Sequence, residues 1–181
     1  MHFWKRLYVG AVFLCLMAAV SAAHAEPKST DDLFKEFIFD GCFPALTTGI
    51  PVDAFARSQH LVPADSHLAD AFLHGRKGSA YIHAVPENVV IIAEGADGYC
   101  TVATQFAPGV LALQKAVETT LMGSGMGFTP IKEDQRQLGG ALSTTREYDG
   151  RIGTQPLGVL FSITETGPPP QAVLSVYRKA R

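Results

Sequence analysis

The sequence predicts an α+β fold in which short N-terminal helices and one longer central helix pack on one face of a largely antiparallel sheet of about seven strands. Two stretches show apolar residues at helical spacing, one before residue 75 and one after Pro108. Within 79–106 and 128–178, short apolar or β-branched runs are separated by turns. Turns this short join antiparallel neighbours, because a parallel pair needs a long crossover. One disulfide is predicted to link the helices to the sheet.

The first residues have the layout of a secretory signal peptide. Lys5 and Arg6 precede an apolar run from Leu7 to Val20, and small residues follow in Ala23-His24-Ala25, where a signal peptidase would cleave. The apolar run is shorter than the ~20 residues that a helix needs to cross a bilayer. We therefore predict that residues 1–25 are a cleaved signal peptide and that the protein is periplasmic or secreted.

The remaining segment, 26–181, fits a single globular domain. Loss of Lys5 and Arg6 would lower the formal net charge from −2 to −4, and the other basic residues are scattered except at the C-terminal end. Nucleic-acid binding requires a concentrated basic surface, so we predict no nucleic-acid partner. No later apolar stretch is long enough to form a transmembrane segment after signal cleavage.

Signal cleavage removes Cys15 and leaves Cys42 and Cys100. In an exported protein such a pair is typical of a disulfide, whereas redox-active pairs usually occur as C-x-x-C. The bond would close a loop of roughly 60 residues, for which the chain-entropy relation gives at most about 4 kcal/mol of stabilisation.

Thr30 is expected to cap the first helix, with Asp31 and Asp32 in its first turn. Gly41 and Pro44 should weaken it near its end. Its apolar positions share one face and are Leu33, Phe34, Phe37, Ile38 and Cys42.

Three further helices are predicted. The second begins with Pro51 in its first turn, and the third runs from Ser66 to His74 before Gly75. The longest runs from Pro108 to about Met122, with glycines between Gly123 and Gly127 ending it. Its expected buried stripe comprises Val110, Leu111, Leu113, Val117 and Leu121.

The predicted sheet contains a hairpin with a turn at Gly95–Gly98. A turn at Gly167–Pro170 should precede the last strand, and its prolines stiffen it. The strands are expected at Ala80–Val85, Asn88–Glu94, Tyr99–Phe106, Phe128–Asp134, Ala141–Tyr148, Leu157–Glu165 and Gln171–Arg178.

The third predicted helix carries a candidate metal site. His67, Asp70 and His74 are spaced i, i+3 and i+7, which places them on one helix face, and His60 precedes them by two turns. Imidazole and carboxylate ligands suit zinc or copper. However, His67 and His74 are about 10 Å apart along the helix axis, so a shared metal would need strained side chains or a ligand from elsewhere. The alternative is a solvent-facing polar surface.

Other polar residues suggest weaker alternatives. His83 lies in a predicted strand, and Glu94 and Asp97 lie at the hairpin tip, where a carboxylate pair held in a cleft can act as acid and base. Arg146 and Arg151 flank a predicted turn at Tyr148-Asp149-Gly150 and could contact an anion. Turn formation and solvation explain these residues equally well.

The sequence favours an exported, non-enzymatic binding or accessory protein that interacts with another protein or a small ligand in the cell envelope. No catalytic motif of high specificity is recognised. A metal-binding protein using His67, Asp70 and His74, and a hydrolase with a spatially assembled site, are the alternatives. The candidate protein-binding surfaces are Gln171–Arg178, expected as an exposed edge strand, and Phe43–Pro51.

Overall fold

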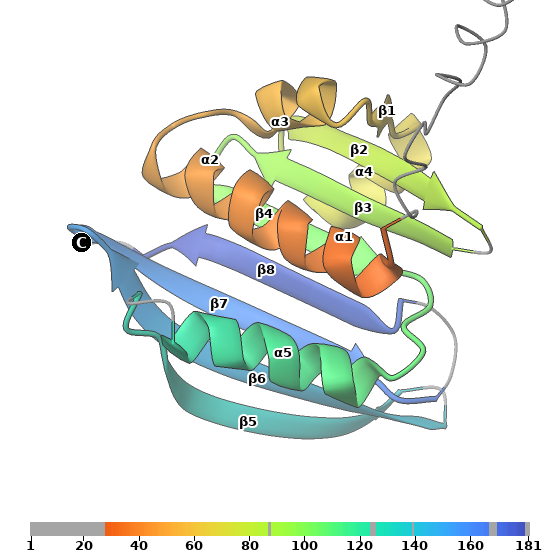
Figure 1. The fold of residues 1–181 in the computed structure, drawn as a ribbon, viewed down its shortest axis with the longest axis vertical. Helices are drawn as coiled ribbons and strands as arrows, with labels where there is room; N and C mark the ends of the chain where they lie inside the picture. The colour runs from red at the N-terminus through yellow and green to blue at the C-terminus, as the bar shows by residue number, and fades with distance from the viewer. Residues whose placement is uncertain (1–27, 87, 124–125, 139, 167–169, 180–181) are drawn as a thin grey trace, which may run out of the picture.

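The computed structural model describes residues 28–86, 88–123, 126–138, 140–166 and 170–179. The predicted signal peptide lies outside these residues, as do parts of the predicted turns at Gly123–Gly127 and Gly167–Pro170. The described residues fold into one sheet covered by helices (Figure 1). The predicted α+β class with an antiparallel sheet and one disulfide is confirmed.

The described part of the chain contributes eight strands, one more than expected. The missed strand is β1, which has only two residues, one of them Pro63, and is too short to show a periodic pattern. The strands are β1 (Val62–Pro63), β2 (Gly78–Val85), β3 (Asn88–Gly95), β4 (Tyr99–Thr104), β5 (Thr129–Leu138), β6 (Ala141–Ile152), β7 (Gln155–Thr164) and β8 (Ala172–Arg178).

The sheet consists of two four-stranded meanders that meet at their last strands. The strand order is β1-β2-β3-β4-β8-β7-β6-β5, and every neighbouring pair is antiparallel. Strands β4 and β8 pair at the centre, from Tyr99 opposite Tyr177 to Thr104 opposite Ala172. The tight turn between β3 and β4 forms as predicted, with Gly98 at a positive φ of 82°.

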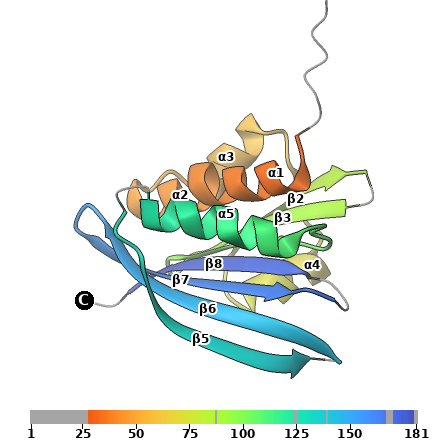
Figure 2. The same ribbon diagram turned by 60° about the horizontal axis from the view of Figure 1, so that its bottom comes forward.

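The helices lie on both faces of the sheet, not on one. Figures 1 and 2 show α1, α2 and α5 side by side on one face and α4 on the other. Leu73 of α4 packs with Ala80 and Ala93 in a cluster separate from the main core, which contains Ile92. Adjacent strand residues point to opposite faces, so the small side chains of Ala80 and Ala93 give α4 room on the second face. The helices are α1 (Thr30–Glu36), η1 (Phe37–Cys42), α2 (Phe43–Thr47), α3 (Val52–Ser58), α4 (Ser66–Leu73) and α5 (Val110–Gly123).

The N-terminal helical run continues through both predicted breakers. It begins one residue earlier than expected, with Ser29 as N-cap accepting a hydrogen bond from the Asp32 amide at 3.1 Å. Segment η1 is a π-helix, and the amide of Phe43 donates to the carbonyl of Ile38, five residues back. This wider turn lets Pro44 enter the helix, because a regular turn would bring its ring against the carbonyl four residues earlier.

A disulfide joins Cys42 in η1 to Cys100 in β4, with their Cα atoms 5.4 Å apart. Both cysteines are fully buried in the main core. The bond spans a sequence separation of 58 residues and fixes the first helical layer to a central strand. The predicted covalent tie is therefore confirmed.

Helix α5 buries a stripe that differs from the prediction at two positions. Leu113, Val117 and Leu121 are buried as expected, whereas Leu111 is 53% exposed and Gln114 is buried in its place. None of the described helices is long and apolar enough to cross a membrane.

Replacing both Cys42 and Cys100 with alanine is expected to lower the free energy of unfolding by up to about 4 kcal/mol, because the denatured chain regains the entropy that the closed loop removes. Urea denaturation followed by circular dichroism measures the change. An unchanged denaturation midpoint would contradict a stabilising role for the bond.

Candidate functional site

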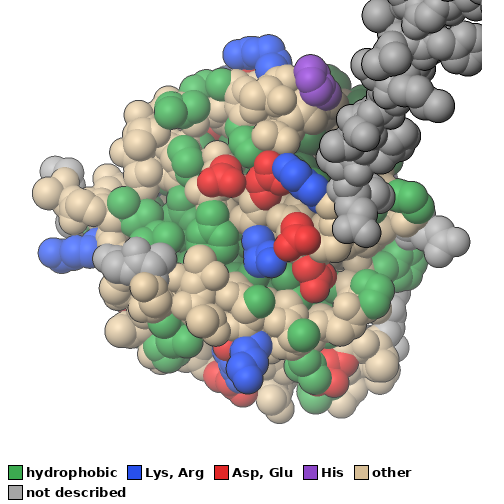
Figure 3. Space-filling view, viewed as in Figure 1, with side chains coloured by type: hydrophobic (Ala, Val, Ile, Leu, Met, Phe, Trp, Pro, Cys, Tyr) green, Lys and Arg blue, Asp and Glu red, His purple; other side chains and the backbone are tan. Residues whose placement is uncertain are grey.

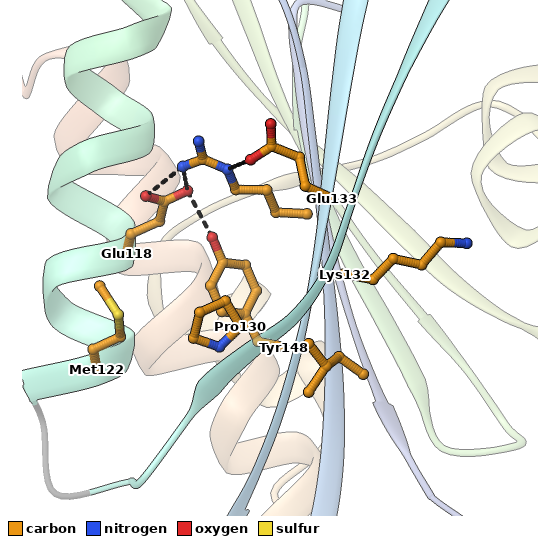
Figure 4. A pocket seen from close by; sticks show the side chains of 8 residues that line it. Glu118, Met122, Pro130, Lys132, Glu133 and Tyr148 are labelled. Carbon is orange, nitrogen blue, oxygen red and sulfur yellow. Dashed lines mark hydrogen bonds and ion pairs between the residues drawn. The ribbon is translucent and has the colours of Figure 1, made fainter.

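A cleft of about 380 Å³ lies between the C-terminal half of α5, the edge strand β5 and its neighbour β6 (Figure 4). It combines a group of hydrogen-bonded charged side chains with an apolar portion. The lining residues are Glu118, Met122, Pro130, Ile131, Lys132, Glu133, Arg146 and Tyr148.

Secondary structure brings the polar lining residues together. Glu118 follows the buried Val117 on α5, so its side chain lies at the border of the buried stripe and is only 13% exposed. Arg146 and Tyr148 are two residues apart on β6 and therefore point to the same face, toward α5. Glu133 is directly opposite Arg146 in the register of β5 with β6.

The guanidinium of Arg146 links two carboxylates from different elements. Its Nη1 donates to both oxygens of Glu118, at 2.7 and 2.9 Å, and its Nε donates to Oε2 of Glu133 at 2.7 Å. Hydrogen bonds to Glu118 and then to Glu133 raise the pKa of Arg146 above its usual value. The arrangement holds α5 against the outer strands through charge-assisted bonds.

Tyr148 completes this group from the core side. Its hydroxyl donates to Oε1 of Glu118 at 2.6 Å, and the side chain is almost fully buried. Burial raises the pKa of Tyr148 well above its usual value, and the hydrogen bond to Glu118 raises it further. The phenol therefore stays protonated and acts as a fixed donor to the carboxylate.

The apolar portion of the cleft is open to solvent. Met122 is 50% exposed and Ile131 is 51% exposed. The register of β5 with β6 shifts between Pro130 and Lys132, which leaves Ile131 as the extra residue of a bulge. In Figure 4 the Lys132 side chain points away from the guanidinium and the two carboxylates.

The predicted turn at Tyr148-Asp149-Gly150 is wrong, because β6 continues without interruption to Ile152. A Cβ atom at Gly150 would meet the ring of Phe128, so this glycine is required by packing within a strand rather than by a turn. Arg146 has two carboxylate partners, and Arg151 lies three residues beyond Tyr148 on the same strand and does not line the cleft. The two arginines therefore do not flank a turn, and of the two only Arg146 lines the cleft.

The predicted metal ligands are not brought together. His67 and Asp70 are exposed on α4, and His74 ends this helix in a left-handed conformation. His60 also has a positive φ and lies before α4. Among the described residues, no group of three or more histidine, cysteine, aspartate or glutamate side chains is placed to hold a metal ion.

The other predicted polar residues have separate structural partners. Oε2 of Glu94 accepts from the amide of Val52 at 2.8 Å and so caps α3, whereas Asp97 pairs with Arg76 at 2.9 Å. The two carboxylates thus do not form an acid–base pair. His83 contacts the ring of Phe37 edge-on, with ring centroids 6.3 Å apart.

Of the two predicted binding surfaces, one lies at the centre of the sheet and the other is buried in its first half and exposed in its second. Strand β8 is central, between β4 and β7, so the expected exposed edge at Gln171–Arg178 is wrong. In Phe43–Pro51, Phe43 and Leu46 are buried, and Ile50 is 53% exposed. Figure 3 shows hydrophobic side chains gathered between α2 and the C-terminal end of α5, whereas charged side chains lie over α1.

Sequence reasoning missed Glu118 and Tyr148 as members of a site. The sequence shows two local patterns. Arg146 and Tyr148 are two positions apart and so share one face of a predicted strand, and Glu118 is next to the apolar stripe of a predicted helix. Neither pattern indicates that the strand and the helix meet. Comparisons with protein-family models, curated proteins and solved structures find no match to this chain.

Replacing Glu118 with glutamine is expected to lower the free energy of unfolding by about 1–3 kcal/mol, because it removes a largely buried charged acceptor of three hydrogen bonds. The matched change Glu133→Gln should cost less than about 1 kcal/mol, since that carboxylate is 45% exposed. Urea denaturation of both variants measures the difference. Equal losses would contradict the assigned difference between the two carboxylates.

Alkaline pH is expected to destabilise the protein through its tyrosines. Burial and a hydrogen bond to Glu147 raise the pKa of Tyr177 from its ordinary 10.0 to about 12. Between these values the unfolded chain releases protons that the folded chain retains, so the free energy of unfolding should fall as pH rises. Urea denaturation across this range measures the fall, which should be smaller in Tyr177→Phe. An identical fall in that variant would contradict the assignment.

Proposed function

We propose that this protein is an exported, non-enzymatic binding protein that takes a small ligand in the cleft between α5 and strands β5 and β6. The observation that carries the proposal is the cleft itself, with its volume of about 380 Å³. Ligand sites typically occupy about 300–1,000 Å³ and combine apolar walls with a few fixed polar groups.

The polar groups of the cleft are preorganised. Glu118, Arg146 and Tyr148 are already held by hydrogen bonds to one another. A ligand therefore meets fixed donors and acceptors and loses less affinity to the ordering of side chains. The exposed Met122 and Ile131 provide apolar area that a ligand can cover.

Binding accounts for Tyr148 and Arg146 better than general-base catalysis does. A general base must accept a proton near the working pH, but the raised pKa values of Tyr148 and Arg146 keep both protonated. Tyr148 donates its single hydroxyl proton to Glu118, and Arg146 donates through Nε and Nη1 to the two carboxylates, which leaves Nη2 of Arg146 as a donor for a ligand. Export rests on the sequence of the first 25 residues, which have a basic start, an apolar run and small residues at the predicted cleavage point.

The test is a screen of small soluble compounds by protein-detected NMR, with Met122→Trp as a variant that fills the mouth of the cleft. Compounds that bind should shift the amide signals of Ile131 and Glu133, and Met122→Trp should abolish these shifts. Leu111→Trp is the matched control, because Leu111 is on the same helix and 53% exposed but does not line the cleft. Binding that maps elsewhere, or survives Met122→Trp, contradicts the proposal.

A further inference from the structure

We infer that the ligand of this cleft carries a positively charged amine on a short apolar chain, an alkylammonium group. The inference rests on the proposed function and specifies its ligand chemistry. It follows from two features of the described lining residues: the net charge of the groups that converge in the cleft, and a carboxylate oxygen that accepts only one long hydrogen bond.

The charges that converge in the cleft have a negative balance. Two carboxylates, Glu118 and Glu133, face one guanidinium, Arg146. The second cation of the lining, Lys132, points away from this group (Figure 4). Glu118, Glu133 and Arg146 together therefore carry one net negative charge, which would attract a ligand cation.

Glu133 provides the acceptor for the amine. Its Oε2 accepts from Arg146, and among the described residues its Oε1 accepts only a long hydrogen bond of 3.4 Å from the Gln135 amide. The carboxylate is 45% exposed and so is accessible from solvent. Ile131 and Met122 line the same cleft and expose apolar side chains, which an alkyl chain attached to the ammonium group can cover.

An anionic ligand is the competing possibility, because Nη2 of Arg146 makes no hydrogen bond among the described residues. An anion at Nη2 would stand beside both carboxylates that already bind the same guanidinium. Its repulsion from Glu118 and Glu133 would oppose its attraction to Arg146. The geometry therefore favours the cation.

The experiment compares hexylammonium, hexanol and hexanoate, which share an apolar chain and differ in charge. Each probe is titrated into the purified protein at neutral pH and low salt, and NMR shifts of cleft amides give the dissociation constants. Hexylammonium should bind about three- to fivefold more tightly than hexanol, the gain typical of an exposed ion pair, and hexanoate most weakly. Hexanoate binding as tightly as hexylammonium overturns the inference.

Two matched variants test the role of Glu133. Glu133→Gln should remove the preference for hexylammonium over hexanol and leave hexanol binding unchanged. Asp134 is the next residue of β5, points to the other face of the sheet and pairs with Arg136. Asp134→Asn removes the same charge as Glu133→Gln and should leave the preference for hexylammonium intact. Equal effects of the two variants overturn the inference, since they would indicate a general charge effect.

The outcomes separate this inference from the proposed function. If hexanol or hexanoate binds in the cleft at least as tightly as hexylammonium, the charge preference is wrong and the binding function remains. If hexylammonium causes no shift of cleft amides, the alkylammonium inference is overturned. The compound screen with Met122→Trp then decides the binding function separately.

Discussion

The covalent bond between Cys42 and Cys100 is the constraint on which the arrangement of the two layers depends. Cys100 lies on β4, which pairs with β3 on one side and with β8 on the other. Cys42 lies in η1, the wider turn that allows the N-terminal helices to continue past Gly41 and Pro44. The bond therefore fixes the first helical layer to the strand that joins the two meanders, and the second meander is positioned through β8.

The cleft lies far from this bond, at the outer strands, and depends on electrostatics instead. When a guanidinium is held between two carboxylates, the attraction among the three groups must offset the cost of removing their charges from water. Removing one partner of a buried ion pair strongly destabilises a protein, because the other charge stays buried without compensation. At Arg146 the partial exposure of Glu133 limits that cost, while Tyr148 stabilises the more buried Glu118. The same arrangement that attaches α5 to β6 leaves Oε1 of Glu133 with a long hydrogen bond of 3.4 Å from the Gln135 amide.

Helices, strands and turns were predicted well where residues close together in the sequence determine them. The alternation at Leu157–Glu165 and the glycine turn at Gly95–Gly98 required only neighbouring residues, and both are confirmed. The wrong predictions concern segments whose position or conformation depends on the element that packs against them or pairs with them. Gln171–Arg178 reads as a terminal strand, but pairing with β4 places it in the centre of the sheet. Gly150 reads as a turn residue, but it accommodates the ring of Phe128 within β6.

By itself the sequence determined the α+β class, the antiparallel sheet and the disulfide, because short turns and two cysteines restrict these features almost without reference to the rest of the chain. Tertiary structure alone decided the strand order, the face that α4 covers and the candidate site. Glu118 and Arg146 are 28 residues apart in sequence and meet only because α5 packs beside β6. The physical reason is that hydrophobic periodicity specifies which face of an element is buried but not which other element covers it.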